Sequence, residues 1–219
     1  SDEDTDFPVM FQLWVPVELE KLEAGLRAAG VPLKASKERL KESDPRKWRG
    51  YLLGVWQRRQ KKHAELRELY DSKLILVEKM LQEWVREHPD MHLPVTFDNW
   101  FTQPDFCRFL DEKLKLAYVG TLAGTDRVLL KTGETTLEDF AQHLKQEHLE
   151  ARSSGGKPVF HRITIPFKGE QETYYSYCST HHIHGFRRQR LVINYRQADL
   201  SDNPTFYISN RLIWHAAGI

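Results

Sequence analysis

The chain has 219 residues, 40% hydrophobic and 29% charged, and its 32 basic and 31 acidic side chains give a formal net charge of +1. This composition is typical of globular proteins and excludes an intrinsically disordered chain. No apolar run approaches the roughly 20 residues of a membrane span, and two cysteines are too few for a disulfide framework. We therefore expect a globular protein of a reducing cytoplasm, with no membrane partner.

The first elements are predicted from apolar patterns. A nearly continuous apolar run at residues 7–15, ended by a proline, predicts a buried strand. Leucines at helical spacing predict a helix at residues 18–29, where a glycine and a proline follow. Residues 31–57 look irregular and inserted, because Pro45, Gly50 and Gly54 interrupt them. One apolar stripe over residues 58–87 then predicts a single long amphipathic helix.

The most informative stretch is Leu93–Phe101, which is predicted to form a short buried strand with Asp98 at its C-terminal end. Thr102, followed three residues later by Asp105, has capping-box spacing and predicts the start of a helix. In α/β folds the ligand crevice lies outside the carboxyl ends of the strands. Asp98 is therefore the candidate catalytic acid of the chain.

The second half is predicted to be rich in strands. Strands at residues 116–122 and 127–130 precede a helix at residues 135–149, which opens with another capping-box spacing. The run Ser153–Gly156 predicts a flexible loop. Four strand-like segments follow, at residues 159–167, 173–178, 191–195 and 205–214. The whole order predicts a mixed α/β (α+β) fold, in which a β-rich half follows a half of alternating strands and helices.

Basic residues form a first cluster within residues 46–62, which contain seven bases and no acid, with Trp48, Tyr51 and Trp56 between them. Cations and aromatic rings together suit a nucleic acid, because cations replace condensed counterions and rings stack on bases. A solvated helix face above buried tryptophans explains the pattern equally well. The bases of this cluster are Arg46, Lys47, Arg49, Arg58, Arg59, Lys61 and Lys62.

A second basic cluster, Arg187, Arg188 and Arg190, lies at a predicted hairpin tip. It suits phosphate contact in a groove, although a solubilising turn would have the same composition. With the first cluster also present, contact with nucleic acid is favoured.

A zinc site is a further possibility, because thiolate and imidazole are the usual ligands of zinc. Cys178 is followed closely by three histidines, His181, His182 and His184. In an extended segment His182 and His184 share one face, whereas His181 points to the other. Histidines that face solvent or DNA are therefore favoured, and a zinc-stabilised β module without a DNA role stays open.

Residues 95–102 resemble the segment around the second catalytic aspartate of DDE transposases of bacterial insertion sequences. In that family an apolar strand ends in Phe-Asp, followed by a small polar residue and an aromatic pair. Residues 7–14 resemble the third strand of the RNase H-like core, and residues 72–74 resemble the start of the helix before the aspartate strand. Residues 118–122 resemble the next core strand, and residues 158–214 the β-rich insertion that many of these transposases carry.

The resemblance implies a partial RNase H-like core of mixed sheet and helices, with a β-rich insertion subdomain. The partial core is expected at residues 1–130, with residues 17–65 as a helical, basic insertion. The helix and the β-rich insertion subdomain are expected at residues 131–214. Residues 215–219 would begin a C-terminal core segment that is missing from the chain.

The resemblance also implies a chemistry. In the family two Mg²⁺ or Mn²⁺ ions, held by two aspartates and a glutamate, promote in-line attack on a phosphodiester. Asp98 is carried over as catalytic and metal-binding. The first aspartate is expected before Ser1, and the glutamate, on a Tyr-Arg-Glu-Lys type helix, after Ile219. The parent enzyme would cleave and join DNA, whereas this chain alone is expected to be inactive.

The partners implied by the resemblance are transposon-end DNA, target DNA and a second copy of the complete enzyme, in the bacterial cytoplasm at the nucleoid. Two alternatives remain. The chain could be a non-enzymatic DNA-binding or assembly module derived from a transposase. Asp98 could also serve only to cap the loop that follows its strand.

Overall fold

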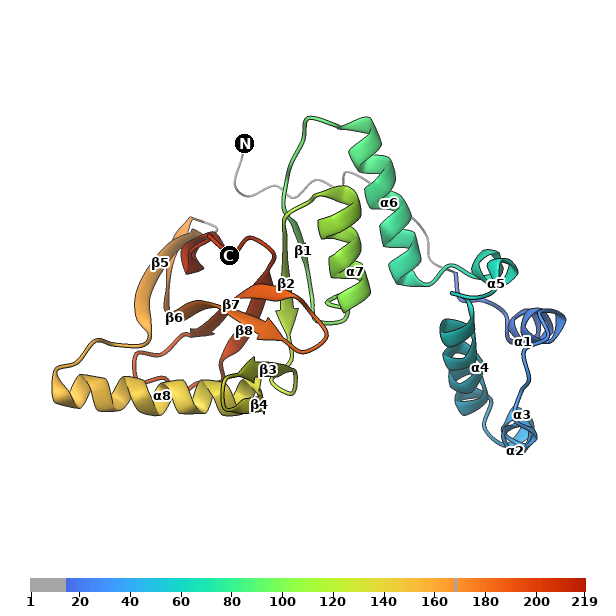
Figure 1. The fold of residues 1–219 in the computed structure, drawn as a ribbon, viewed down its shortest axis with the longest axis horizontal. Coiled ribbons are helices and arrows are strands. Elements are labelled where there is room, and N and C mark those ends of the chain that lie inside the picture. The colour runs from blue at the N-terminus through green and yellow to red at the C-terminus, as the bar shows by residue number, and fades with distance from the viewer. Residues whose placement is uncertain (1–14, 168) are drawn as a thin grey trace. The chain divides into compact units, whose positions relative to one another are not determined.

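The computed structural model of the protein describes residues 15–167 and 169–219. The chain divides into two compact units, with the boundary between Leu81 and Gln82. We call residues 15–81 the helical unit and the described residues from 82 to 219 the sheet unit, and Figure 1 shows the elements of both. The predicted strand at residues 7–15 lies outside the described residues, apart from Val15.

The helical unit is built from short helices around one small core. Leu22 and Leu26, which are fully buried, confirm the helix predicted at residues 18–29. They pack with Trp48, Leu52 and Trp56 in a single hydrophobic cluster. The helices of this unit are α1 (Leu19–Ala28), α2 (Ala35–Glu38), α3 (Leu40–Ser43), α4 (Pro45–Arg59) and α5 (Ala64–Leu69), followed by the start of α6 (Lys73–Glu87).

The prediction that residues 31–57 are irregular is wrong, because α2, α3 and α4 lie there. Pro45 occupies the first turn of α4, where a missing N–H costs no hydrogen bond. The Asp44 side chain caps this helix by accepting a bond from the Lys47 N–H at 3.1 Å. Gly50 and Gly54 lie inside α4, so the burial of its apolar face outweighs their low helix propensity.

The single helix predicted at residues 58–87 is also wrong, because the helical path breaks twice, before α5 and before α6. Tertiary hydrogen bonds stabilise the turn at the first break, between α4 and α5. The Trp56 Nε1–H donates to the Leu66 carbonyl at 2.7 Å, and Arg67 donates to the carbonyls of Gln60 at 3.0 Å and Lys61 at 2.8 Å. These contacts satisfy carbonyls that a continuous helix would have paired internally.

The sheet unit contains a mixed sheet of eight strands among the described residues, which confirms the α+β class. Its order is β1-β2-β8-β7-β6-β3-β4, and β5 pairs with β6 off this path. Only β1 and β2 pair in parallel, and the other pairs in the described chain are antiparallel. The strands are β1 (Val95–Phe97), β2 (Tyr118–Leu122), β3 (Arg127–Leu130), β4 (Gly133–Thr136), β5 (His161–Phe167), β6 (Glu170–Ile183), β7 (Arg188–Tyr195) and β8 (Thr205–Ser209).

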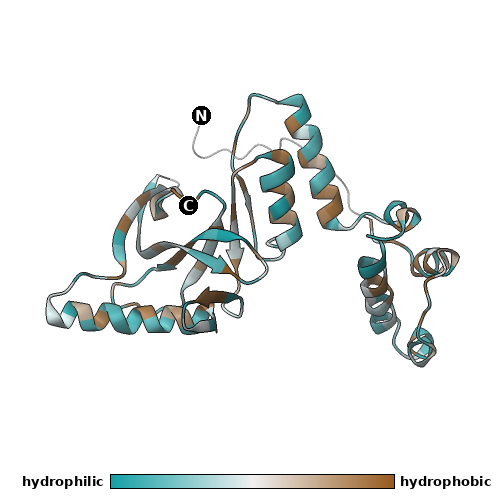
Figure 2. Ribbon diagram, in the orientation of Figure 1, coloured by the Kyte–Doolittle hydropathy of each residue, from teal (hydrophilic) through white to brown (hydrophobic). Residues whose placement is uncertain are grey.

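Helices connect and cover this sheet. Between β1 and β2 the chain forms α7 (Pro104–Arg108) and a π-helical turn (Phe109–Leu114), beside the two strands in Figure 1. The amphipathic α8 (Leu137–Ser154) carries hydrophilic and hydrophobic stretches along its ribbon in Figure 2. Its buried Phe140 packs edge-on against Tyr177 of β6. A short 3-10 turn (Ala216–Gly218) lies near the C-terminus.

Several local predictions are confirmed, with shifted ends. The Thr136 side chain caps α8 by accepting a bond from the Asp139 N–H at 3.1 Å. This helix continues to Ser154 and ends at Gly155, whose φ of 71° suits glycine, so Ser153 and Ser154 are not a loop. The strand predicted at residues 205–214 ends at Ser209.

The two halves of the sheet unit share one sheet, because β2 pairs directly with β8. The division at residue 130 into a partial core and an insertion subdomain, which the resemblance implies, stays a prediction. In residues 15–167 and 169–219 no helix has both the length and the apolar character needed to cross a membrane.

Candidate functional site

Asp98 directly follows β1 and its side chain is exposed. Its Oδ1 accepts bonds from the N–H groups of Trp100 at 3.0 Å and Phe101 at 3.3 Å, which is an Asx turn. Its Oδ2 makes no hydrogen bond to any residue that the structure describes. Asp98 thus lies at the strand end, as predicted, with one carboxylate oxygen committed to its own loop.

The strand that carries Asp98 is not buried as predicted. Val95 and Phe97 are half-buried and Thr96 is exposed, because β1 lies at the end of the strand order within the described chain. Pro94, which precedes the strand, is compatible with such an edge position.

The loop after Asp98 is held differently from the prediction. Helix α7 begins at Pro104, so Thr102 does not cap it. Instead the Thr102 hydroxyl donates to the Asp98 carbonyl at 2.9 Å. Gly120 of β2 makes this packing possible, because a Cβ there would lie 2.5 Å from Phe97 Cε2 and 2.7 Å from Thr102 Oγ1. The absence of a side chain at Gly120 therefore sets the position of the Asp98 loop.

A metal site needs several converging ligands, and the described residues contain no group of three or more His, Cys, Asp or Glu side chains that could hold an ion. Asp98 is one carboxylate, whereas two divalent ions require several. Within residues 15–167 and 169–219, the side chains present therefore do not fit a two-metal centre by themselves.

The cysteine and the three histidines of the possible zinc site do not converge. The Cys178 thiol points to the Trp214 carbonyl at 3.8 Å. His181 is half-buried, its Nε2 lies 2.8 Å from the Tyr177 hydroxyl, and partial burial lowers the pKa of this histidine. His184 pairs with Glu134 on β4. The fold thus offers no common point at which these ligands meet.

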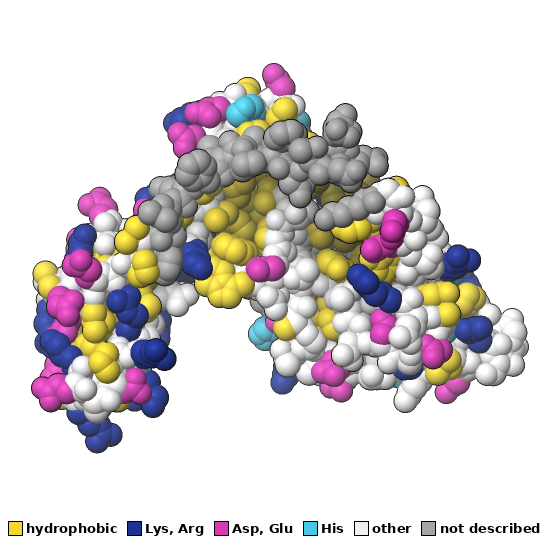
Figure 3. Space-filling view, turned by 180° about the vertical axis from the view of Figure 1, so that it is seen from behind, with side chains coloured by type: hydrophobic (Ala, Val, Ile, Leu, Met, Phe, Trp, Pro, Cys, Tyr) yellow, Lys and Arg dark blue, Asp and Glu magenta, His cyan; other side chains and the backbone are white. Residues whose placement is uncertain are grey.

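The first basic cluster lies on α4 and in the turn after it. Arg49 donates to the Val17 carbonyl at 2.9 Å, and Lys47 forms an ion pair with Asp44 at 3.0 Å, so both have structural partners. The other side chains of the cluster are exposed, namely Arg46, Arg58, Arg59, Lys61 and Lys62. Figure 3 shows Lys and Arg side chains over much of the helical unit, with acidic side chains among them.

The aromatic residues of this cluster are not available to nucleic-acid bases. Trp48 is 0% exposed and Trp56 is 3% exposed, both in the core of the helical unit. Tyr51 stacks on Trp48, and its hydroxyl accepts a bond from the Lys34 N–H at 2.7 Å. The interpretation as a solvated helix face above buried tryptophans is thus correct for the rings, while the outward cations remain candidates for phosphate contact.

The second basic cluster lies where β6 turns into β7. Arg190 is half-buried and donates through Nε to the Trp214 carbonyl at 2.8 Å, so its role is structural. Arg188 is exposed and pairs in register with His182 across the hairpin. Arg187, at the tip, forms an ion pair with Glu112 of the π-helical turn at 2.5 Å.

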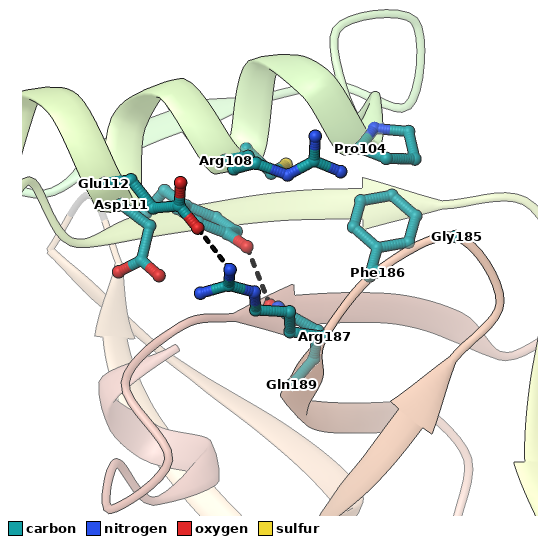
Figure 4. A pocket seen from close by; sticks show the side chains of 10 residues that line it. Pro104, Arg108, Asp111, Glu112, Gly185, Phe186, Arg187 and Gln189 are labelled. Carbon is teal, nitrogen blue, oxygen red and sulfur yellow. Dashed lines mark hydrogen bonds and ion pairs between the residues drawn. The ribbon is translucent and has the colours of Figure 1, made fainter.

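The structure also contains a recess that the sequence did not indicate. It has a volume of about 140 Å³ and lies between α7, the π-helical turn, β2 and the β6–β7 hairpin (Figure 4). Tyr118, Cys107 and Gln189 are buried in its lining. The Tyr118 hydroxyl donates to Gln189 Oε1 at 2.8 Å. Burial raises the pKa of the Cys107 thiol to about 12 and also raises that of Tyr118, so both side chains are neutral.

A wider hollow, of about 600 Å³, continues from this recess. The two share the residues Asp111, Phe186, Arg187 and Gln189, and the wider hollow adds His182 and Arg188. The Asp111 carboxylate is held by the Asn210 amide at 2.8 Å. We call the recess and the hollow together the hairpin groove.

The hairpin groove joins segments that are far apart in the chain, since Tyr118 and Gln189 are 71 positions apart. Only the basic hairpin tip was visible in the sequence. Comparison of this chain with protein families, curated proteins and solved structures finds no match.

Proposed function

We propose that the chain is part of a DDE transposase that cleaves and joins DNA phosphodiesters. One observation carries the proposal: β1, α7 and β2 form a parallel strand-helix-strand unit that places Asp98 at the carboxyl end of β1. This is the edge at which open α/β sheets bind and transform their ligands. Among the described residues β1 has one strand neighbour, β2, and the resemblance would add the remaining core strands on its other side.

The proposed reaction requires Mg²⁺ or Mn²⁺, which would stabilise the attacking and leaving oxygens. Asp98 is the ligand that this chain would supply. Its Oδ1 is fixed by the N–H groups of Trp100 and Phe101, which leaves Oδ2 for an ion. The proposal requires further acids, and the resemblance assigns these to segments before Ser1 and after Ile219.

Nicking of supercoiled plasmid tests the catalytic part of the proposal. The isolated chain is expected to be inactive with Mg²⁺ or Mn²⁺. A longer parent polypeptide that includes the flanking segments is expected to nick DNA, and Asp98→Asn should abolish this activity. Nicking by the isolated chain that depends on Asp98 would overturn the claim of incompleteness. Parent activity that persists in the Asp98→Asn variant would overturn the catalytic role.

DNA is the proposed partner, as transposon end and as target, and the proposed location is the bacterial cytoplasm at the nucleoid. The exposed cations of α4 and of the β6–β7 hairpin support DNA binding, because Lys and Arg on a surface release counterions from phosphates. A homodimer is proposed only for the complete enzyme.

The second candidate is a non-enzymatic DNA-binding module. It is favoured by the commitment of Asp98 Oδ1 to its own turn and by the lack of an acidic cluster among the described residues. This alternative predicts DNA binding by the parent polypeptide without metal-dependent nicking. Both candidates predict that Asp98→Asn leaves the DNA affinity of the isolated chain unchanged, so nicking by the parent separates them.

A further inference from the structure

We propose that the hydrogen bond between His148 and Phe160 is an acid-sensitive latch. It holds the connection between α8 and β5 on the sheet, and protonation of His148 releases this connection while the strands stay paired. The connection consists of residues 155–160 and follows the end of α8 (Figure 1). It lies within the sheet unit, together with His148, and its release depends neither on DNA binding nor on catalysis.

The latch requires a neutral imidazole. His148 is 3% exposed, and its Nδ1 accepts a hydrogen bond from the Phe160 N–H at 3.0 Å. A protonated imidazole carries an N–H donor at both nitrogens and has no acceptor. Protonation therefore places two donors opposite each other and leaves the buried Phe160 N–H without a partner, which is costly.

The surroundings of His148 oppose its protonation. Burial lowers the pKa of His148, and the nearby Arg152 of α8 and His161 of β5 lower it further. The acid that precedes it in the sequence, Glu147, pairs instead with His143 at 3.3 Å. No carboxylate of the described residues forms an ion pair with His148, so its charged form has no stabilising partner.

Phe160 anchors the connection through its ring. Residues 152–158 are exposed and Val159 is half-buried, whereas Phe160 is 2% exposed. The Phe160 ring packs edge-on against Tyr195 of β7, with ring centroids 5.3 Å apart. Its centroid also lies 6.2 Å from that of Tyr177 of β6. Phe160 is thus the point at which the connection is fixed to the sheet.

Few backbone hydrogen bonds support the connection. The Gly156 N–H donates to the Ala151 carbonyl at 2.7 Å, which closes the end of α8. The next hydrogen bond along the described connection is the latch itself. Because β5 begins at His161, release of Phe160 breaks no strand pair. Segments of this kind open locally before the strands of a sheet separate.

The Tyr195 hydroxyl makes the closed arrangement easier to open. It is buried and has no hydrogen-bond partner among the described residues. Burial raises the pKa of Tyr177 and raises that of Tyr195 to about 12, so both phenols that pack on Phe160 stay neutral. A buried polar group without a partner destabilises the state that contains it. Departure of the Phe160 ring opens one side of the Tyr195 ring to water.

The direction of the pH effect follows from proton binding. A histidine in the open connection has a pKa of about 6.5, whereas the pKa of His148 in the closed connection is lower. The open form therefore binds more protons as the pH falls. The latch is closed above about pH 6.5 and weakens progressively below it, by up to about tenfold in the ratio of open to closed forms per pH unit.

Amide hydrogen exchange, followed for each residue by NMR from pH 8 to pH 5, tests the latch. Each rate is compared with the intrinsic rate at the same pH, which removes the pH dependence of the exchange chemistry. The protection factor of Phe160 should be constant above about pH 6.5 and fall by up to about tenfold per pH unit below it. Val192, which is 0% exposed in β7, should stay at least about tenfold better protected at every pH, because it exchanges only when the sheet opens.

Three variants assign the effect to His148. In His148→Asn the side-chain oxygen takes the place of Nδ1 and accepts from the Phe160 N–H without titrating, so protection of Phe160 should become independent of pH. His161→Gln should make the fall smaller, because the pKa of His148 then lies closer to its value in the open form. His143→Gln is the matched control on the same helix and should leave the profile unchanged, since His143 is exposed.

A constant Phe160 protection factor between pH 8 and pH 5 would overturn the latch. Equal protection of Phe160 and Val192 at each pH would also overturn it, because exchange would then require opening of the whole sheet. A fall that persists in folded His148→Asn would assign the effect to another group, with the same consequence. If His148→Asn does not fold, the wild-type profile and His161→Gln still decide. DNA enters none of these measurements, so their failure leaves the proposed function untouched.

Discussion

The helical unit and the sheet unit both combine arginines with aromatic residues, but they use them differently. On α4 the aromatics Trp48 and Trp56 recur at helical spacing and are buried, so the cations alone face outward. At the β6–β7 hairpin Phe186 lies in a turn beside Arg187 and remains at the rim of a recess. The comparison teaches that aromatic residues among basic ones stay accessible to a partner only where the backbone keeps their rings outside a core.

Among the variants that test this comparison, truncation of Trp48 should cause the largest loss of stability. Trp48→Ala should lower the free energy of unfolding of the helical unit by about 3–5 kcal/mol, because it removes a fully buried ring. Hydrogen exchange should speed up in residues 15–81 and stay unchanged in residues 82–219. Trp48→Phe is the control. The Nε1 atom of Trp48 has no hydrogen-bond partner among the described residues, so the phenylalanine variant loses no hydrogen bond. Unchanged exchange in the alanine variant would contradict the burial of this ring.

Gly120→Ala tests the packing beneath Asp98 in the sheet unit. The added methyl would lie 2.5 Å from Phe97 and 2.7 Å from Thr102, and overpacking of this kind costs about 1–3 kcal/mol. Chemical denaturation measures the loss, and nicking by the parent polypeptide should fall as well. Gly124→Ala is the matched control, because a Cβ there has its nearest neighbour at 3.4 Å. Equal stability of both variants would show that the Asp98 loop does not depend on Gly120.

Much of the fold could be predicted from the sequence where local signals decide. The cap at Thr136, the leucine spacing of α1 and the turns between the C-terminal strands are encoded by nearby residues. The break of the helix after Arg59 was missed, because it depends on the contact of Trp56 with the Leu66 carbonyl across the turn. Periodicity continues through such a break, so it indicates an amphipathic stretch without showing where the helix ends.

The candidate site was predictable only in part, for the same reason. Asp98 was placed at a strand end, and its capping role was recognised as an alternative because Asp favours such turns. The recess depends on the pairing of β2 with β8 and on the contact of Tyr118 with Gln189. No local pattern encodes these distant contacts, so they could not be read from a single sequence.

Acidification should weaken the sheet unit more than the helical unit. Burial lowers the pKa of His148 and of His181, and the His148 Nδ1 accepts a bond from the Phe160 N–H at 3.0 Å. The unfolded chain, with histidine pKa values of about 6.5, therefore binds more protons than the folded one as the pH falls. Stability is thus complete above about pH 6.5 and is lost progressively below it.

Thermal melting between pH 8 and pH 5 measures this loss, and residues 82–219 should show it in hydrogen exchange. His148→Gln should lessen the pH dependence, since glutamine does not titrate. His143→Gln is the control, because His143 is exposed on the same helix. A melting temperature independent of pH over this range would contradict the burial of these rings.

The smallest expected effect is on the salt dependence of DNA binding, and it should differ between exposed and structural arginines of the helical unit. If the proposed DNA binding holds, Arg58→Ala and Arg59→Ala should each lower the slope of log affinity against log salt by about one for duplex DNA, because each would remove one phosphate contact. Arg49→Ala should leave that slope unchanged and instead destabilise the unit, since Arg49 donates to the Val17 carbonyl at 2.9 Å. Anisotropy titrations at several salt concentrations measure the slopes. If neither exposed arginine changes the slope, the phosphate contacts belong to the sheet unit, and Arg187 is the next residue to test.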